Sequence, residues 1–420
     1  MAVDKSSDKT ARDQVDESYR FDVLILDAEY KQSLASARSL GKAGLRVALG
    51  VSSSEYEPGT PLPAFLSRYS ARNTVLPSYA GDGAEYAAAV LAFVRENPVP
   101  VVLPTGDASI SALVPHRKEL AELGATLAVA PDSVLEIAND KDRTLEIARE
   151  LGIAQPKSMR IDAVGDLDAV MAEFEFPFVL KPTISWTGQA ADRIFPVEVI
   201  DKAEALEATQ RFLEAGAAVL AQQWASGRRE GVSLFIDHGE ILATCGHVAY
   251  RTSPVLGGAS VMRESITPPA DIHTAAVRLA GAVGMEGPCE VEFRRDAQGK
   301  PLLMEINARL AGTIENAIRS GVDFPLMLWQ WAAGKPITRF DSYRVGVRTR
   351  WLRGDMRWLR DNWRASGRPD TVSRPRALWI FGSEFTRTRY YDYFDRHDLR
   401  PAMAELRSMT AATLTSRDQR

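Results

Sequence analysis

The stretch Cys289-EVEFRRDAQGKPLLMEINAR-Leu310 decides the fold of this chain. Polar and apolar residues alternate in both of its halves, as they do in strands that bury one face. Gln298-Gly299 lies between the halves and suits a two-residue turn. The pattern therefore predicts a β-hairpin.

This hairpin sets two acids against each other. With the turn at Gln298-Gly299, Glu292 lies opposite Glu305 and Glu290 lies opposite Asn307, all on one face. Like charges directly opposite on a sheet repel, so the arrangement indicates a divalent cation between them. Oxygen donors without His or Cys favour Mg²⁺ over zinc, and Mg²⁺ held this way usually also binds nucleotide phosphates. An ordinary hairpin with solvent-facing acids is the alternative.

Size and composition set the class of protein. The chain has 420 residues, of which 45% are hydrophobic, enough for two or three domains with their own cores. A net charge of −4 gives no indication of nucleic-acid binding. Cys245 and Cys289 are too few for a disulfide framework or a zinc site. Residues 1–20 predict a disordered tail without a signal peptide, and no apolar run reaches the roughly 18 residues of a membrane helix. We expect a cytoplasmic protein.

Residues 21–130 predict a small doubly wound α/β domain. Apolar strands at Phe21–Leu26, Leu45–Leu49 and Val99–Leu103 alternate with helical stretches. The loop Asp27–Ser33 after the first strand has no glycine, so a dinucleotide pyrophosphate cannot approach its backbone. An NAD enzyme is therefore disfavoured.

Residues 131–335 predict a second α/β unit that contains the hairpin. Within it, residues from about 155 to 228 predict a small β-rich subdomain, with strands at Phe176–Lys181 and Ala218–Gln223. Residues 336–420 are rich in Arg and Trp and predict a C-terminal extension.

Several residues of the second unit could hold a nucleotide. Lys181 ends an apolar strand just before a proline, and Lys141 begins a helix, where a cation opposes the helix dipole unless an anion binds nearby. Taken alone, each lysine is more often a surface residue. The strand that ends at Gln223 breaks into a polar turn, whose free backbone groups could read an adenine edge, with Glu230 within reach of ribose hydroxyls.

Taken in order, these residues resemble the signature of the ATP-grasp superfamily, which includes biotin carboxylase, carbamoyl-phosphate synthetase and D-alanine-D-alanine ligase. The residues that carry the resemblance are Lys141, Lys181, Gln222, Gln223, Trp224, Glu230, Glu292, Glu305, Asn307 and Arg309. It covers residues 130–335 by motif and the N-terminal domain by architecture only. It implies an ATP-grasp fold with a pre-ATP-grasp α/β domain and a β-rich lid.

The resemblance also implies roles for these residues. Lys141 and Lys181 would bind the ATP phosphates, the backbone of Gln222 to Trp224 would hold adenine, and Glu230 the ribose. The metal ligands, for two Mg²⁺ or Mn²⁺ ions, would be Glu292, Glu305 and Asn307. Arg309, with Lys181, would act on the carboxylate or its acyl phosphate.

The implied activity is ATP-dependent ligation of a small carboxylate to an amine, with release of ADP and phosphate. The alternatives are phosphorylation of a small acid, as in carbamoyl-phosphate synthetase, and an inactive ATP-binding regulatory protein. Similar proteins are often homodimers. Two departures stand out: the loop Thr183–Gln189 has one glycine where many members have a glycine-rich loop, and Gln222 stands where some members carry an acid. The biotin carboxylase loop is absent, which disfavours carboxylation.

A polar loop ahead of the hairpin is a candidate acceptor site. Its candidate substrate residues are Arg251, Gly257, Gly258 and Arg263. In similar ligases the matching loop lies near the acceptor, so we expect Arg251→Ala to raise the KM for the acceptor and leave ATP binding intact. A long surface loop with a turn is the alternative.

The C-terminal extension predicts an amphipathic helix. Its apolar positions are Leu352, Met356, Leu359 and Trp363, and its basic positions are Arg353, Arg357, Arg360 and Arg364. Docking onto the main domain is the commoner use of such a helix, and peripheral contact with an anionic membrane is the alternative. Gly354 weakens the helix prediction.

Overall fold

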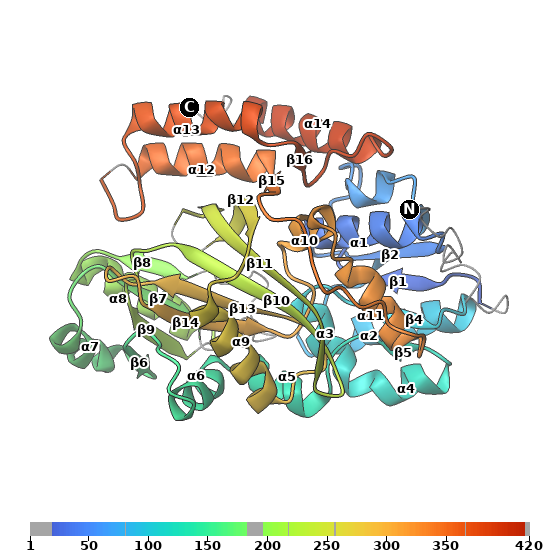
Figure 1. Cartoon of the computed structure of the whole chain (residues 1–420), viewed down its shortest axis with the longest axis horizontal. Coiled ribbons are helices and arrows are strands. Elements are labelled where there is room, and N and C mark those ends of the chain that lie inside the picture. The colour runs from blue at the N-terminus through green and yellow to red at the C-terminus, as the bar shows by residue number, and fades with distance from the viewer. Residues whose placement is uncertain are drawn as a thin grey trace, which may run out of the picture. The chain divides into compact units, whose positions relative to one another are not determined.

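The computed structural model describes residues 19–79, 81–182, 196–216, 218–255, 258–365 and 367–415. The chain forms two compact units. Figure 1 shows the chain coloured from its N-terminus to its C-terminus. Unit 1 comprises Met1–Val129, Asp323–Thr338 and Tyr393–Arg420, and unit 2 comprises Ala130–Val322 and Arg339–Asp392. The segment expected to be a separate C-terminal extension, residues 336–420, is thus divided between both units.

Unit 1 contains a parallel sheet. Its described strands are β1 (Val23–Ile25), β2 (Val47–Ser52), β3 (Ser70–Leu76), β4 (Val101–Leu103) and β5 (Thr126–Leu127), in the order β3-β2-β1-β4-β5. The helices are α1 (Lys31–Lys42), α2 (Ala84–Glu96), α3 (Asp107–Leu113), α4 (Arg117–Glu122), α11 (Phe324–Ala332) and α14 (Arg400–Thr415). Every residue of β1 and β4 is buried, as expected for a parallel sheet covered on both faces. The predicted doubly wound domain is confirmed.

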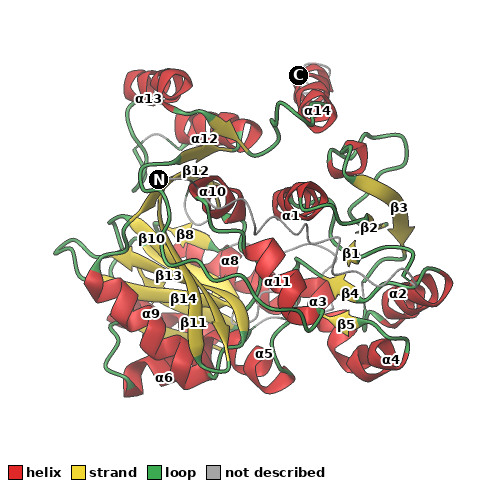
Figure 2. Cartoon of the chain, turned by 45° about the vertical axis from the view of Figure 1, so that its right-hand side comes forward, coloured by secondary structure: helices red, strands yellow, loops and turns green. Residues whose placement is uncertain are grey.

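Unit 2 is built on a large sheet, ordered β14-β13-β10-β11-β12-β15-β16. The strands are β10 (Arg229–Asp237), β11 (Glu240–Ser253), β12 (Ala259–Ile266), β13 (Gly287–Arg295), β14 (Pro301–Asn307), β15 (Arg348–Arg350) and β16 (Tyr390–Tyr391). Helix α9 (Ala270–Val283) packs against β10 and β13 (Figure 2). Helices α5 (Asp132–Ala138), α6 (Lys141–Glu150) and α10 (Ile314–Ser320) complete this part.

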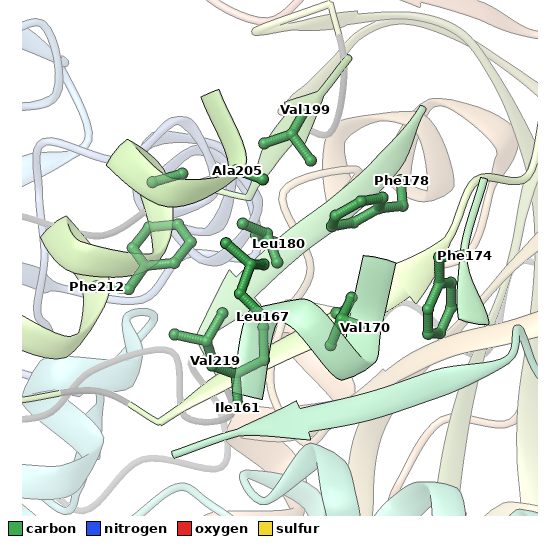
Figure 3. Close-up of a cluster of buried hydrophobic side chains, with 12 residues drawn as sticks. Ile161, Leu167, Val170, Phe174, Phe178, Leu180, Val199, Ala205, Phe212 and Val219 are labelled. Atoms are coloured by element: carbon green, nitrogen blue, oxygen red, sulfur yellow. The ribbon is translucent and has the colours of Figure 1, made fainter. Parts of the chain in front are cut away.

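A smaller sheet in unit 2 corresponds to the predicted lid. Strands β6 (Ser158–Ile161), β7 (Phe178–Pro182), β8 (Val197–Val199) and β9 (Val219–Gln223) lie in the order β6-β9-β7-β8. Helices α7 (Leu167–Glu173) and α8 (Lys202–Glu214) cover one face, and Phe212 and Val170 share a core with Phe178 and Leu180 (Figure 3). Because side chains alternate along β7, Val179 and Lys181 lie on the opposite face. The glycine-poor loop Thr183–Gln189 lies outside the described residues.

The hairpin of β13 and β14 has the predicted pairing but a different turn. Glu290 pairs with Asn307 and Glu292 with Glu305, as predicted. The two-residue turn is wrong: Asp296 N donates to Lys300 O, so that three residues, 297–299, close the loop with Gly299 at φ +83°. A bulge between Glu292 and Phe293 then shifts the register by one residue. The two deviations compensate, which is why the acids still face each other.

The predicted C-terminal helix exists as α12 (Leu352–Arg364), followed by α13 (Arg374–Arg387). It packs against β11 and β12 with a different face from the one expected. Its buried residues are Gly354, Asp355, Trp358 and Asn362. The predicted apolar positions Met356 and Trp363 remain 44% and 41% exposed. Within the described residues, no helix is both long and apolar enough to span a membrane.

Candidate active site

The facing strands β13 and β14 gather a set of carboxylates. Asn307 Nδ2 donates to Glu292 Oε1 at 3.3 Å and to Glu305 Oε1 at 3.4 Å. Burial, together with the charges of Glu290 and Glu305, raises the pKa of Glu292 well above its usual range. The positive charge around these carboxylates is therefore too small to keep all of them ionised, which fits a site for a cation.

Lys141 and Lys181 supply cations to this group. Lys141 begins α6, and its Nζ lies 3.8 Å from Glu305 Oε2. Lys181 is buried on the face of β7 opposite the lid core, and its Nζ donates to Gln222 Oε1 at 2.9 Å. Burial, and then the charge of Lys141, lowers the pKa of Lys181 to about 8.

These lysines change the ionisation of Glu305. Burial raises the pKa of Glu305, but Lys141, Lys181 and Arg309 outweigh burial and hold this pKa below its ordinary value. Glu305 is therefore the charged partner of the facing pair, and Glu292 is the one that takes up a proton. One cation from α6, one from β7 of the lid and one from just beyond β14 thus act on a single carboxylate.

The donor set fits a hard divalent ion. Within the described residues, no group of three or more His, Cys, Asp and Glu side chains is arranged to hold a metal. Glu292 and Glu305 nevertheless offer carboxylate oxygens from two paired residues, while the neighbouring Asn307 amide presents its Nδ2 to both of them. Burial favours the protonated form of Glu292, and a bound cation would neutralise its carboxylate in place of that proton.

The hinge segment, residues 224–228 between β9 and β10, is hydrogen-bonded to β13. Gly227 N donates to Arg295 O at 2.8 Å, and a Cβ on Gly227 would lie 2.5 Å from that oxygen, so only glycine fits. The guanidinium of Arg294 stacks over the Trp224 ring at 4.3 Å. Gln223 N donates to Lys157 O at 2.8 Å. Gln222, Gln223 and Trp224 therefore lie where the two sheets of unit 2 join.

Glu230 does not join this group. It pairs with Phe293 and Val248, on the face of β10 opposite to Gly231, which pairs with Glu292. Its carboxylate accepts a hydrogen bond from Arg295 Nε at 2.5 Å. A shift of one residue moves a strand side chain to the other face, so the expected ribose ligand does not fit this placement. Glu230 shares the two-residue period of the apolar Val232, Leu234 and Ile236, and this was the signal in the sequence.

Arg251 and Arg263 are also placed differently from the prediction. Arg251 Nε and Nη2 donate to the two carboxylate oxygens of Asp355, at 2.6 and 2.8 Å. Arg263 is fully buried and donates to Asp392 Oδ1 at 2.5 Å. Both guanidinium groups form ion pairs with acids of the C-terminal segment, so an acceptor-binding role does not fit them. The expected effect of Arg251→Ala on the KM for the acceptor alone does not fit this placement either.

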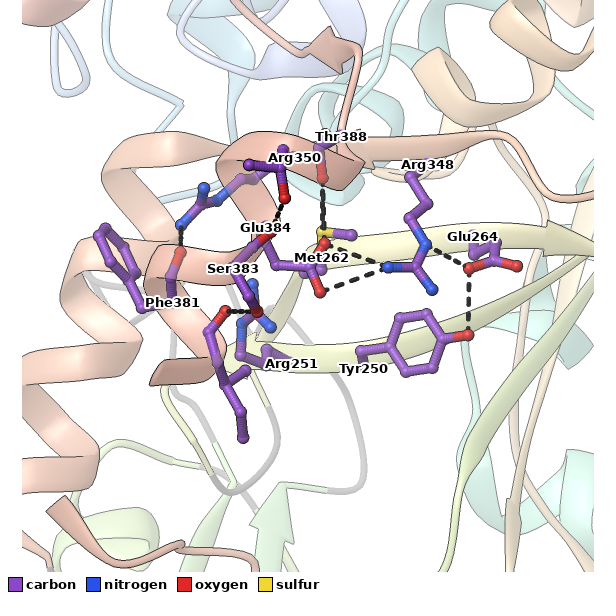
Figure 4. A network of polar contacts seen from close by, with 12 residues as sticks. Tyr250, Arg251, Met262, Glu264, Arg348, Arg350, Phe381, Ser383, Glu384 and Thr388 are labelled. Atoms are coloured by element: carbon purple, nitrogen blue, oxygen red, sulfur yellow. Dashed lines mark hydrogen bonds and ion pairs between the residues drawn. The ribbon is translucent and has the colours of Figure 1, made fainter. Parts of the chain in front are cut away.

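Arginines of β15 also form ion pairs and hydrogen bonds that connect α13 to the sheet (Figure 4). Arg348 Nε donates to Glu264 Oε2 at 2.6 Å, and its Nη1 donates to Glu384 of α13 at 3.3 Å. Arg350 Nη2 donates to Phe381 O at 3.0 Å. The arginines of this segment hold its helices in place.

Of the two candidate glycines in the acceptor loop, Gly258 is required by the backbone geometry of the loop. A Cβ on Gly258 would lie 2.0 Å from the backbone of Ser253, and its N donates to Pro254 O at 3.1 Å. Gly258 thus closes the turn between β11 and β12. Gly257 lies outside the described residues.

Two residues contact the carboxylates although no sequence pattern predicted that they would. Thr313 Oγ1 donates to Glu290 Oε1 at 2.5 Å, and His247 Nδ1 lies 3.6 Å from the same oxygen. His247 lies over Gly231, whose Cβ would be only 2.2 Å from the ring. Both hold Glu290 beside Glu292.

Solved structures share this architecture. An L-amino acid ligase from Bacillus licheniformis matches with a TM-score of 0.56 and 18% identity, over 76% of this chain and 75% of that one. Biotin carboxylase from Campylobacter jejuni, solved as a β-γ-ATP complex, matches with a TM-score of 0.60 and 14% identity, over 79% and 75%. The chain has the ATP-grasp fold.

Sequence comparisons agree with the ATP-grasp assignment. Residues 251–354 match a family described as ATP-grasp in the biosynthetic pathway with Ter operon. D-alanine–D-alanine ligase of Ectopseudomonas mendocina is 26% identical over 185 residues, 41% of this chain. The carbamoyl phosphate synthase large chain of Thermoanaerobacter pseudethanolicus is 24% identical over 224 residues, 51% of this chain and 20% of its own. The chain spans 55% of that D-alanine–D-alanine ligase.

Proposed function

We propose that the protein is an ATP-dependent ligase that activates a small carboxylate as an acyl phosphate, couples it to an amine, and releases ADP and phosphate. The supporting observation is the convergence of Lys141 and Lys181 on Glu305, which faces Glu292 in the hairpin. Three of the proteins with the same fold or related sequence are named as ligases or as a synthase.

Each residue has a role in this proposal. Lys141 and Lys181 bind the phosphates of ATP, because Lys141 Nζ lies 3.8 Å from Glu305 and the charges of Glu305 and Glu292 act on Lys181. Glu292, Glu305 and Asn307 hold Mg²⁺, which screens the charge on the phosphates. Arg309 lies two residues beyond β14, and its charge acts on Glu305. From there it neutralises the substrate carboxylate and the transferred phosphoryl group.

The function is tested by ADP release with a panel of small acids and amines, in the presence of ATP and Mg²⁺. Ligation predicts ADP release that requires both an acid and an amine, and a condensed product by mass spectrometry. Arg309→Ala should reduce product formation by at least a hundredfold, since it removes charge stabilisation in the transition state. ATP affinity, measured by calorimetry, should change less than threefold. Full activity in this variant would contradict the role of Arg309.

A second activity has its own support. The similarity to the carbamoyl phosphate synthase large chain favours phosphorylation of a small acid such as bicarbonate. In that case ADP release would depend on the acid alone and would not need an amine. ATP binding without turnover on any pair would instead indicate a regulatory nucleotide-binding protein.

A further inference from the structure

Arg229, and not Glu230, lies on the face of β10 that carries the candidate site. In the antiparallel pair of β10 and β13, Arg229 lies opposite Arg294, and Gly231 lies opposite Glu292. Since side chains two residues apart share a face, Arg229 projects from the same face as Glu292. It comes from the first residue of β10, directly after the hinge.

The two paired arginines differ in their partners. Arg294 forms an ion pair with Asp370, stacks on Trp224, and is 7% exposed. Arg229 is partly buried and makes no hydrogen bond or ion pair with another residue in the described part of the chain. Burial, and then the charge of Arg294, lowers the pKa of Arg229 to about 10. The charges of Asp370, Glu292 and Glu305 act on Arg229, but within the described residues no acid forms an ion pair with it. A shielded cation opposite a like charge is unfavourable without an anion in contact.

Asp370 explains why Arg229, and not Arg294, is available to such an anion. Asp370 lies between α12 and α13 and neutralises Arg294. Close by in the chain, Arg368 pairs with Glu204 of α8 in the lid. The connection between α12 and α13 therefore holds Arg294 against the hinge and contacts the lid, which gives this part of the C-terminal segment a role at the site.

The position of Arg229 indicates which anion it meets. Arg294 and Trp224 mark the hinge end of the site, and Glu292, Glu305 and Lys141 mark the metal end. Arg229 lies directly opposite Arg294, with Cβ atoms about 5 Å apart, and diagonally from Glu292, about 7–8 Å away. If adenine lies at the hinge and the outer phosphates lie at the carboxylates, the group between them is the ribose with the α-phosphate.

We propose that Arg229 donates hydrogen bonds to the α-phosphate of the bound nucleotide; this inference rests on the proposed ATP site. Guanidinium groups have five donors and no acceptor, and they match phosphate oxygens in a bidentate geometry. A carboxylate at this position would instead accept from the ribose hydroxyls. The nucleotide is therefore recognised here by its charge and not by its sugar.

Calorimetric titration of the whole chain with AMP, ADP and adenosine tests this assignment. AMP carries only the α-phosphate, so Arg229→Gln should weaken AMP and ADP binding by ten- to a hundredfold, in the range of a hydrogen bond to a charged group. Adenosine affinity should stay the same. Arg228→Gln is the matched control, because Arg228 is adjacent, 61% exposed and on the other face, and it should bind all three ligands like the parent.

Thermal unfolding separates this role from a structural one. Because Arg229 has no partner among the described residues and faces Arg294, Arg229→Gln should unfold at the same temperature as the parent or above it. Unchanged AMP affinity, or an equal loss for adenosine, would overturn the inference. A parent protein that binds none of these ligands would overturn the ATP site itself, which is a distinguishable result.

Discussion

Among single residues, Glu29 of unit 1 has a buried carboxylate that the proposed function does not use. Both of its carboxylate oxygens are shielded from solvent and lack a hydrogen-bond partner. Burial, and then the charge of Asp27, raises its pKa to about 9. Asp27 itself is satisfied, since Oδ2 accepts from Thr105 N at 2.8 Å and from Gly106 N at 2.7 Å. Ionisation of Glu29 therefore opposes folding.

The sign of the effect follows from the raised pKa. Folded Glu29 keeps a proton that the unfolded chain releases above pH 4.5, so stability is lost as the pH rises toward about 9. We expect Glu29→Gln to remove this loss, with a gain over the parent that grows by at most about 1.4 kcal/mol per pH unit. Urea denaturation between pH 6 and 9 measures it. Glu122→Gln, at an exposed position of α4, is the control. A gain that is independent of pH would contradict the assignment.

At the scale of elements, α12 shows why a helical pattern does not reveal which face is buried. Gly354, which weakened the helix prediction, is the residue that lets α12 approach β12. A Cβ there would lie 2.3 Å from Trp351 Cε3 and 2.6 Å from Val261 Cγ1. The buried Asp355 then meets Arg251 and Arg350. Close packing and a buried ion pair, rather than the apolar stripe, select the face.

This packing predicts opposite effects of one substitution in two neighbouring helices. Gly354→Ala should destabilise by about 1–3 kcal/mol, because overpacking exceeds the gain in helix propensity. Gly382→Ala in α13 should stabilise by about 0.5–1 kcal/mol, since nothing lies within 4 Å of its added Cβ. Thermal and urea denaturation compare the two variants with the parent. Stabilisation by Gly354→Ala would show that α12 does not pack closely on β12.

For the whole molecule, the decisive feature is that the last part of the chain belongs to both units. Asp355 and Asp392 of unit 2 pair with the buried Arg251 and Arg263. In unit 1, Asp398 accepts from Arg38 Nε at 2.9 Å, with both side chains almost fully buried. Each arginine would be left as an unpaired buried charge without this segment.

We therefore expect a chain ending at residue 335 not to fold. Breaking one buried pair costs about 3–5 kcal/mol, and several such losses exceed the roughly 5–15 kcal/mol that stabilises a typical domain. Near-ultraviolet circular dichroism and urea unfolding of the shortened chain measure this directly. A cooperative transition at the midpoint of the full chain would mean that residues 336–420 are a removable appendage. Membrane binding should accordingly be tested on the intact chain.

Local pattern was sufficient for some features of this protein. The parallel sheet of unit 1 and the pairing of Glu290, Glu292, Glu305 and Asn307 follow from apolar runs and from alternation, which act between near neighbours in sequence. The position of Glu230 was open to the same argument, since it shares a face with the apolar residues Val232 and Leu234 of β10. The order of the lysines and acids along the chain was enough to suggest the fold.

Only the tertiary structure decided the partners of the arginines and the buried face of α12. Arg251 and Asp355 are 104 residues apart, and Arg263 and Asp392 are 129 apart. Any of the many Arg and Asp residues could have paired by charge alone, and the sequence does not rank these choices. Burial selects among them, because a charge that packing removes from water needs a partner at the same place. Local sequence therefore determined the strands and their register, while packing determined which charges remain available to a ligand.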